Sequence, residues 1–248
     1  MEPVFRTLEI ASSMAVRATG TTITYQNLEN IPSHGGAVVA INHTSYIDFM
    51  PAALGTRRRR RRIRFMIKAE MQDVRIVDFL ISRTGTIPVN RQAGANAYLE
   101  AVRQLRAGEL VGVYPEATIS RAFVLKDFKS GAARMALEAQ VPIIPCIVWG
   151  AHRVWTKDHP KDLDRNKFPV TVRYGTPLPP VGTPVELDAV LKERMSAILH
   201  EVQLAYPHPA GEWWVPECLG GGAPTLEQAN KLDEEELAER ARRAAERH

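Results

Sequence analysis

Length, composition and charge describe an ordinary globular chain. It has 248 residues, of which 45% are hydrophobic, 24% charged and 7% aromatic, and these proportions exclude a collagen-like, coiled-coil or largely disordered architecture. The two cysteines form no CxxC pair and no metal-type cluster, so we expect no disulfide framework, no structural zinc and a reducing compartment. The length suits one catalytic-sized domain followed by a tail.

The first twenty residues predict a short amphipathic helix. Apolar side chains recur there at helical spacing, at Val4, Phe5, Leu8, Ala11, Ala15 and Val16. Such a helix could dock on lipid or pack on its own domain, and the pattern leaves both open. No apolar run reaches the roughly 18–20 residues that cross a bilayer, so neither a membrane-spanning segment nor a signal peptide is expected.

Strand and helix patterns alternate through residues 21–205. Apolar and β-branched runs predict strands at 21–25, 37–41, 64–67, 86–89, 110–114, 142–148 and 170–174. Helical patterns cover 95–105, 131–140 and 187–204. This alternation predicts an α/β fold, a single domain with a mixed, mostly parallel β-sheet flanked by helices. Residues 206–248 are predicted to form a Pro/Gly-rich wrapping segment that ends in a surface helix from 226 onward.

The basic character of the chain is local. The formal net charge is +4, yet Arg57 to Arg62 are six consecutive arginines, and without them the charge would be −2. With Arg64 they form a patch suited to phosphates of lipid head groups or of a nucleotide-bearing cofactor. A solvated loop is the simpler alternative. Because no aromatic residue interleaves with the run, nucleic-acid binding is not expected.

A histidine and an aspartate follow the predicted strand 37–41. Ligands in α/β sheets bind outside the carboxyl ends of strands, which is where His43 should lie. Asp48 is five residues further on and would stand about 140° from His43 on a regular helix, so the pair can meet only if His43 is in the turn. Asp48 would then fix the tautomer of His43 and leave the other ring nitrogen to accept a proton. The alternative is a helix-capping aspartate beside a structural histidine.

Two more polar segments follow strands of the predicted sheet. Residues 114–121 carry Glu116, Thr118, Ser120 and Arg121, a set that could hold a polyol acceptor or form an ordinary turn. The strand over 86–89 leads to Arg91, which suits bidentate phosphate recognition or a surface ion pair.

Together these segments resemble the glycerophospholipid acyltransferase family, which includes the lysophosphatidic acid acyltransferases. His43 and Asp48 match its H-x4-D motif, residues 85–91 match G-x-[IF]-x-[IV]-x-R, and residues 141–145 match V-P-[IV]-[IV]-P. Residues 68–71 read K-A-E-M where the family often has K-x-E-L. The order and spacing of the motifs fit over residues 35 to 180.

One motif departs from the family pattern. The family usually reads F-P-E-G-T-R-S where residues 114–120 read Y-P-E-A-T-I-S, so Ala117 replaces the glycine and Ile119 the arginine. That arginine is thought to hold the phosphate of the acceptor in the family. Arg121 or the arginines of residues 57–64 could substitute for it.

The resemblance implies transfer of an acyl group from a thioester of coenzyme A or acyl-carrier protein to a hydroxyl of a lysophospholipid, without an acyl-enzyme, metal or redox cofactor. His43 is the expected general base, and Asp48 orients it. Glu116 and Arg91 are expected to position the acceptor, with Arg91 on its phosphate. Further acceptor contacts are expected at Asn42, Lys68, Thr118, Ser120 and Arg121. Backbone N–H groups of Pro142 to Ile144, including Ile143, are the candidate oxyanion donors.

Lipid substrates imply a membrane surface as a partner. The N-terminal helix, the arginine run and Trp213 with Trp214 are the available contacts, although two tryptophans in such a tail could instead cover their own domain. We expect peripheral attachment to the cytoplasmic face of the cell membrane. Lysophosphatidic acid is the family's commonest acceptor, while another lysophospholipid or a glycolipid remains open, as does the oligomeric state. A thioesterase has no G-x-S-x-G elbow to support it, and a non-catalytic binding module leaves His43, Asp48 and Glu116 unexplained.

Overall fold

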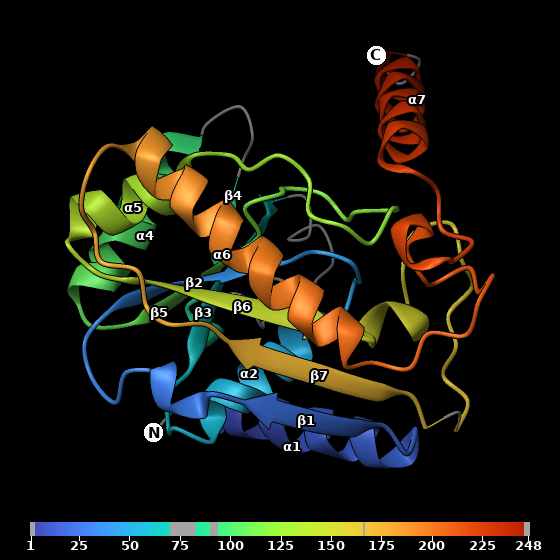
Figure 1. The fold of residues 1–248 in the computed structure, drawn as a ribbon. Helices are drawn as coiled ribbons and strands as arrows, with labels where there is room; N and C mark the ends of the chain where they lie inside the picture. The colour runs from blue at the N-terminus through green and yellow to red at the C-terminus, as the bar shows by residue number, and fades with distance from the viewer. Residues whose placement is uncertain (1–2, 70–82, 90–93, 166, 246–248) are drawn as a thin grey trace.

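A seven-stranded β-sheet forms the centre of the molecule (Figure 1). The computed structural model describes residues 3–69, 83–89, 94–165 and 167–245. The strands are β1 (Thr22–Gln26), β2 (Ala37–Ile41), β3 (Ile63–Lys68), β4 (Ile87–Val89), β5 (Leu110–Val113), β6 (Ile143–Trp149) and β7 (Pro169–Tyr174). They lie in the order β1-β7-β6-β2-β5-β3-β4. Of the neighbouring pairs, β6 with β7 is antiparallel and the others are parallel, so the predicted mixed, mostly parallel sheet is confirmed.

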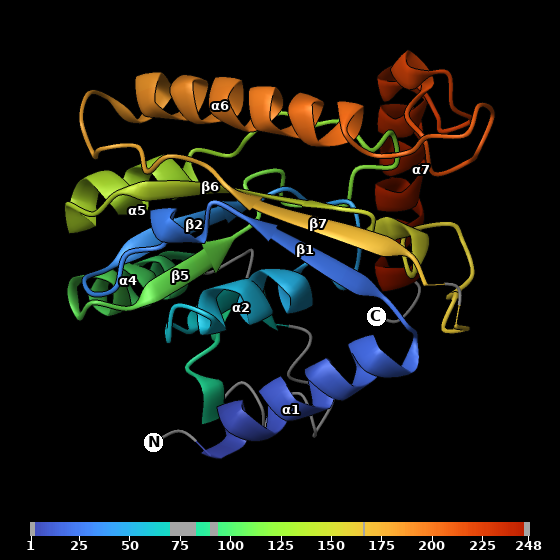
Figure 2. The same cartoon turned by 60° about the horizontal axis from the view of Figure 1, so that its bottom comes forward.

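Helices lie on both faces of this sheet (Figure 2). They are α1 (Pro3–Ala18), α2 (Phe49–Arg57), α4 (Gly94–Arg106), α5 (Gly131–Ala139), α6 (Pro184–Leu204) and α7 (Leu226–Ala245). Short 3-10 turns occur at Leu28–Asn30, Ala151–Arg153 and Glu217–Leu219. The sequence pattern did not delimit α2, whose Pro51 and Gly55 are weak helix formers. Gly55 is required there, because a Cβ atom would stand 2.3 Å from the hydroxyl of Tyr174.

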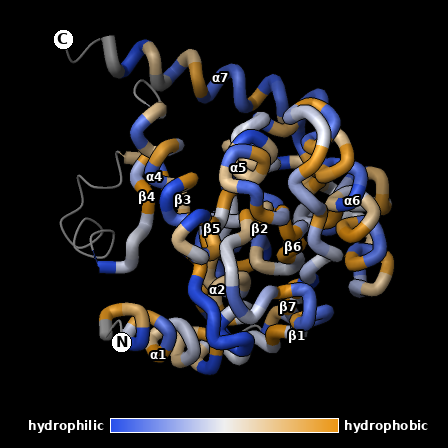
Figure 3. Tube along the Cα trace, turned by 90° about the vertical axis from the view of Figure 1, so that its left-hand side faces the viewer, coloured by the Kyte–Doolittle hydropathy of each residue, from blue (hydrophilic) through white to orange (hydrophobic). Residues whose placement is uncertain are grey.

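The central strands are buried on both faces. Every residue of β2 and β6 is buried, as expected for strands covered by helices on both sides. Val38 and Ala40 face the core under α4, α5 and α6, whereas Val39 and Ile41 face the core under α2. The hydropathy of the chain follows this arrangement, with apolar residues concentrated in the middle strands (Figure 3). The two-sided core holds the strand ends, and therefore the loops that follow them, in fixed positions.

The arginine run joins α2 to β3 at the edge of the sheet where β2 and β5 begin. The guanidinium of Arg61 donates to the carbonyl oxygens of Pro32, Gly35 and Gly108 at 2.7–2.8 Å, and these residues precede β2 and β5. Glu9 of α1 pairs with Arg57 at 3.2 Å and also with Arg62. The run thus fastens two loops and α1 to the body, while Arg59 and Arg60 are exposed.

The N-terminal helix packs on the α2 side of the sheet (Figure 2). Phe5 lies under the guanidinium groups of Arg62 and Arg64, about 5 Å from each, so one face of the helix contacts its own domain. On the outer face, Ile10 and Met14 are 48% and 64% exposed. Packing of α1 on its own domain is therefore observed, and docking of its exposed apolar face on lipid stays a prediction.

The Pro/Gly-rich segment after α6 wraps the body. Trp214 is buried at 4% exposure, and Trp213 stacks on the ring of His159 with 3.8 Å between centroids. Trp214 therefore covers an apolar region of its own domain, which is one of the two alternatives that the sequence allowed, while Trp213 is half-buried. A membrane contact through this segment stays a prediction. Within the described residues, none of the helices has the length and apolar character needed to cross a membrane.

Candidate active site

The polar segments that follow β2 and β5 meet at one edge of the sheet. The two strands are parallel neighbours, with Ala40 opposite Val113, so residues 42–48 and 114–121 leave them on the same side. Each segment binds the other through its backbone, since the N–H of Ser120 donates to the carbonyl oxygen of His43 at 2.8 Å. This edge is where ligands bind in α/β proteins, and it is the edge expected from the sequence.

His43 and Asp48 form the predicted pair. Nδ1 of His43 lies 3.3 Å from Oδ2 of Asp48, with His43 in the turn and Asp48 immediately before α2. The imidazole is 19% exposed and the carboxylate is fully buried. No described residue hydrogen-bonds the other ring nitrogen, Nε2. If Nδ1 carries the proton and donates it to Asp48, Nε2 is a proton acceptor open to a ligand.

Asp48 is held by the turn that it closes. Its Oδ2 accepts the backbone N–H groups of Thr44 at 2.8 Å and Ser45 at 2.7 Å. Burial raises the pKa of Asp48 above its ordinary value, while the hydrogen bonds from His43, Ser45 and Thr44 oppose that shift. Three donors on one oxygen fix the carboxylate next to the imidazole. Asp48 can therefore orient His43 and stabilise its protonated form.

Glu116 connects the two loops of the site. Its Oε1 accepts the N–H of His43 at 2.8 Å, and its Oε2 accepts the N–H of Lys126 at 3.0 Å. Burial raises the pKa of Glu116 to about 7, because these hydrogen bonds only partly offset the loss of solvation. With both oxygens used by backbone donors, Glu116 acts here as a brace for the loop that carries His43.

The segment that departs from the family pattern has a distinct local conformation. The ring of Tyr114 stacks on the imidazole of His43, with 4.0 Å between centroids. Ala117 has a φ of 60°, a left-handed conformation that glycine adopts at lower cost, which explains why glycine is usual at this position. Ile119 is buried at 3% exposure. Its position therefore faces the protein interior and offers no charge to a ligand.

The other expected acceptor contacts differ in their surroundings. Asn42 is fully buried, and its amide pairs with the backbone of Val148 at 2.7 and 3.1 Å; it joins β2 to β6 instead of contacting substrate. Ser120 is also fully buried, and its hydroxyl donates to Val124. Thr118 is half-buried and Lys68 is exposed at the carboxyl end of β3. Arg91 lies outside the described residues.

The expected oxyanion segment lies at the wrong edge of the sheet. Ile143 pairs with Val38 near the start of β2, five residues before His43, which corresponds to roughly 16 Å along a strand. Its N–H already donates to the carbonyl oxygen of Leu178 at 3.0 Å. Pro142, Ile143 and Ile144 therefore start a core strand. The predicted strand over residues 142–148 put this segment at a strand start, but only the parallel pairing of β6 with β2 shows that this start lies away from His43.

Two substitutes were expected for the family arginine that Ile119 replaces. One of them lies far from His43, and the other is already held in ion pairs. The arginines of residues 57–64 lie at the opposite edge from His43, where β2 and β5 begin. Arg121 follows Ser120 at the correct edge but is only 8% exposed, and its guanidinium pairs with Asp158, Asp233 and Glu236. Sequence reasoning missed this cluster, because its acidic members come from distant segments.

An α/β sheet with a His–Asp pair at its carboxyl edge is what the family resemblance requires. Residues 22–149, just over half of the chain, match the family described as Acyltransferase. The chain therefore belongs to the acyltransferase family.

Curated relatives narrow the comparison. The chain is 27% identical over 125 residues to a 1-acyl-sn-glycerol-3-phosphate acyltransferase from Bacillus subtilis, covering 50% of this chain and 61% of that protein. It is 29% identical over 183 residues to a probable enzyme of the same name from Mycoplasma pneumoniae, covering 68% and 66%. The crystal structure of the 1-acyl-sn-glycerophosphate acyltransferase from Thermotoga maritima superposes with a TM-score of 0.69 at 22% identity, covering 82% and 81% of the two chains. This last likeness supports the fold.

Proposed function

We propose that this protein transfers a fatty acyl group from a thioester to a hydroxyl of a lysophospholipid, with 1-acylglycerol-3-phosphate as the first acceptor to test. The observation that carries the proposal is the pairing of His43 with the buried Asp48, at 3.3 Å, on the carboxyl edge of the sheet. The names of the relatives supply the acceptor class. Coenzyme A or acyl-carrier protein would carry the acyl group as a co-substrate, and the chemistry requires no further cofactor.

The proposed reaction is a direct acyl transfer. Nε2 of His43 takes the proton of the acceptor hydroxyl as its oxygen attacks the thioester carbonyl carbon. The carbon–sulfur bond then breaks, and the proton on His43 passes to the departing thiolate. Asp48 holds the imidazole through Nδ1 and stabilises its transient positive charge. Glu116 keeps the His43 backbone in place, and no covalent acyl-enzyme forms.

Thiol release from palmitoyl-CoA, with and without lysophosphatidic acid, tests this proposal. We expect release that depends on the acceptor and falls by at least about 100-fold in His43→Ala, because general-base catalysis contributes that much or more. His200→Ala, on the exposed face of α6, is the matched control and should retain full activity. Release of equal rate without acceptor would identify a thioesterase instead. Acceptor-dependent release that survives in His43→Ala would contradict the general-base role.

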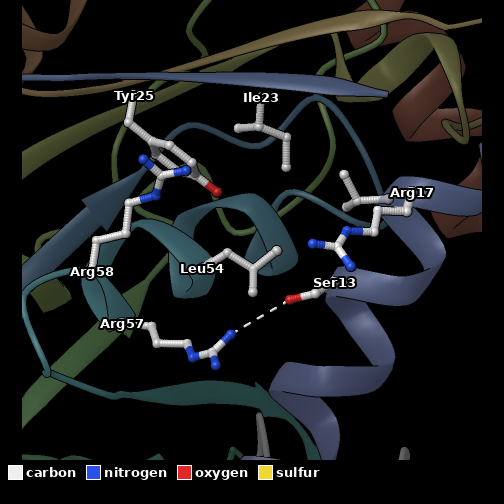
Figure 4. A pocket seen from close by; sticks show the side chains of 8 residues that line it. Ser13, Arg17, Ile23, Tyr25, Leu54, Arg57 and Arg58 are labelled. Carbon is white, nitrogen blue, oxygen red and sulfur yellow. Dashed lines mark hydrogen bonds between the residues drawn. The ribbon is translucent and has the colours of Figure 1, made fainter. Parts of the chain in front are cut away.

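We further propose that the protein meets its lipid substrates at a membrane surface through α1. A cavity of about 450 Å³ lies between α1, β1 and α2. The guanidinium groups of Arg17, Arg57 and Arg58 surround its apolar floor of Ile23 and Leu54 (Figure 4). Its cationic rim lies beside the exposed apolar face of α1. This combination suits anionic lipid head groups above a shallowly inserted helix.

Sedimentation with vesicles tests the membrane contact. Ile10→Asp with Met14→Asp should reduce binding to vesicles of phosphatidylglycerol, since it places two carboxylates on the outer face of α1. Leu237→Asp, on the exposed face of α7, is the control and should bind as the wild type does. Deleting the arginines is a poorer test, because Arg57 and Arg62 also hold α1 through Glu9. Equal binding by all three proteins would refute attachment through α1.

A further inference from the structure

Helix α7 meets the body of the protein through a group of three cations, which we call the cation cluster: Arg121, Lys126 and Lys157. The guanidinium of Arg121 pairs with Asp233, and its Nη2 lies 3.0 Å from Oε2 of Glu236. Lys157 lies 3.1 Å from Asp233 and 2.8 Å from Glu236, and Lys126 also pairs with Asp233. Two carboxylates of one helix thus satisfy three cations from the loops of the body.

The cation cluster is attached to the candidate active site. Arg121 directly follows Ser120, whose N–H donates to the carbonyl oxygen of His43. Lys126 donates its backbone N–H to Glu116, which accepts the N–H of His43 with its other oxygen. Two members of the cluster are therefore each connected to His43 through one intervening residue and its hydrogen bonds. An anion held by them would be bound by the same loop that fixes the backbone of His43.

Charge dominates the attachment of α7. Among its residues of described burial, only Ala229 is buried, at 4% exposure. Its leucines Leu226, Leu232 and Leu237 are 42%, 39% and 54% exposed. In the ribbon the helix stands on the outside of the molecule, away from the sheet (Figures 1 and 3). Because little apolar area is buried, the helix gains little from the hydrophobic effect, and its attachment depends on the ion pairs of Asp233 and Glu236.

The charges of the two carboxylates match those of a phosphate monoester. The cluster carries three positive charges, and Asp158, which also pairs with Arg121, supplies one negative charge from the body. Asp233 and Glu236 supply the remaining two. A phosphate monoester carries about −1.5 to −2 near neutral pH, and its oxygens suit the guanidinium fork of Arg121. Among the described side chains of the cluster, replacing the two carboxylates by one phosphate would leave the sum of charges close to zero.

We propose that Arg121, Lys126 and Lys157 bind the phosphate monoester of the acceptor, and that Asp233 and Glu236 of α7 fill this site until the acceptor displaces them. The inference rests on the proposed function for the identity of the acceptor. The proposal assigns the phosphate contact to these three cations and not to position 119, where the family has an arginine and this chain has the buried Ile119. It also makes α7 a competitor of the substrate, so that release of the helix and binding of the acceptor are linked.

Calorimetric binding of glycerol 3-phosphate to the full-length protein tests the site without using activity. Asp233→Asn with Glu236→Gln removes the internal anions at nearly constant size, and we expect it to bind this probe at least about tenfold more tightly than the wild type. Glu234→Gln with Glu235→Gln is the matched control, since it makes the same charge change at exposed positions of the same helix. Adding Lys157→Ala to the first double variant should remove the gain. Glycerol, which lacks the phosphate, should not bind.

A thermal-unfolding experiment covers the case in which the double variant is unstable. In this variant the three cations face only the carboxylate of Asp158. The Tm of the variant should therefore be lower than that of the wild type, and it should rise on adding glycerol 3-phosphate but not on adding glycerol. Equal affinity of the two double variants for the probe, or a gain that persists with Lys157→Ala, would overturn the proposed site.

Activity separates this proposal from the proposed function. If the site is correct, the KM for lysophosphatidic acid falls in Asp233→Asn with Glu236→Gln, while kcat stays within about twofold. Acyl transfer with an unchanged KM would retain the function and reject the competition by α7. Tighter binding of glycerol 3-phosphate without any acyl transfer would retain the phosphate site and reject the acyltransferase assignment.

Discussion

At the scale of single residues, buried carboxylates hold the loops of the candidate site. Asp48 accepts two backbone N–H groups beside His43, and Glu116 accepts one from each of two loops. Sequence spacing predicted that these residues belong to a site, because polar residues after neighbouring parallel strands meet at one edge. It did not predict that Glu116 would be occupied by the backbone. A side chain's partner depends on loop conformation, which residues such as Ala117, with its positive φ, decide locally.

Glu116→Gln tests this bracing role. A glutamine has one acceptor oxygen, so its NH2 group must face one of the two N–H groups that Glu116 now accepts. A buried donor left without a partner costs about 1–3 kcal/mol. We expect the free energy of unfolding to fall by about that amount in urea titrations at pH 5, below the pKa of about 7, where Glu116 is protonated in the folded protein, its hydroxyl oxygen can still accept, and the substitution removes no buried charge. Glu193→Gln, exposed on α6, should have no effect; equal stability of both variants would refute the brace.

At the scale of elements, the arginine run shows how position determines role. As a sequence it is a phosphate-binding patch or a solvated loop. In the structure Arg61 ties together the loops before β2 and β5, Arg57 and Arg62 secure α1, and Arg59 and Arg60 remain exposed. The sequence could not distinguish these roles, because six identical residues carry no information on which of them faces the body.

Arg61→Ala and Arg59→Ala form a matched pair for this conclusion. Both remove one positive charge from the run, but only Arg61 donates to three carbonyl oxygens. We expect Arg61→Ala to lower the free energy of unfolding by about 2 kcal/mol or more, and Arg59→Ala by less than about 0.5 kcal/mol. Chemical denaturation measures both. Similar losses in the two variants would mean that the run acts through its total charge.

At the scale of the whole molecule, the wrapping segment closes the core over β6. Nε2 of His152 lies 3.1 Å from the carbonyl oxygen of Trp214, and its ring contacts Phe123 and Trp149. Burial lowers the pKa of His152 to about 3. The ring is therefore neutral in the folded protein at pH values where an exposed histidine would be charged.

This arrangement predicts that acid destabilises the fold. Below pH 6.5 the unfolded chain protonates His152, while the folded protein resists protonation until about pH 3. The free energy of unfolding therefore decreases as pH falls through this window, by up to about 1.4 kcal/mol per pH unit from this group. In His152→Gln the free energy of unfolding should also decrease between pH 6 and pH 4, but its slope should be smaller by up to about 1.4 kcal/mol per pH unit. His200→Gln, at an exposed position, should keep the wild-type slope; an unchanged slope in His152→Gln would contradict the prediction.

The amino-acid pattern by itself predicted most of the strands and helices, though not α2, as well as the α/β class and His43 with Asp48 as a candidate pair. These follow from local periodicity and from the rule that parallel strands end at one edge of a sheet. The sequence put residues 142–144 and the arginine run before predicted strands, but only the tertiary structure decided that these strands run parallel to β2 and β5, so that both segments stand at the opposite edge from His43. It also decided that Asp233 meets Arg121. Contacts between residues so far apart depend on strand order and loop path, and local sequence patterns do not encode either.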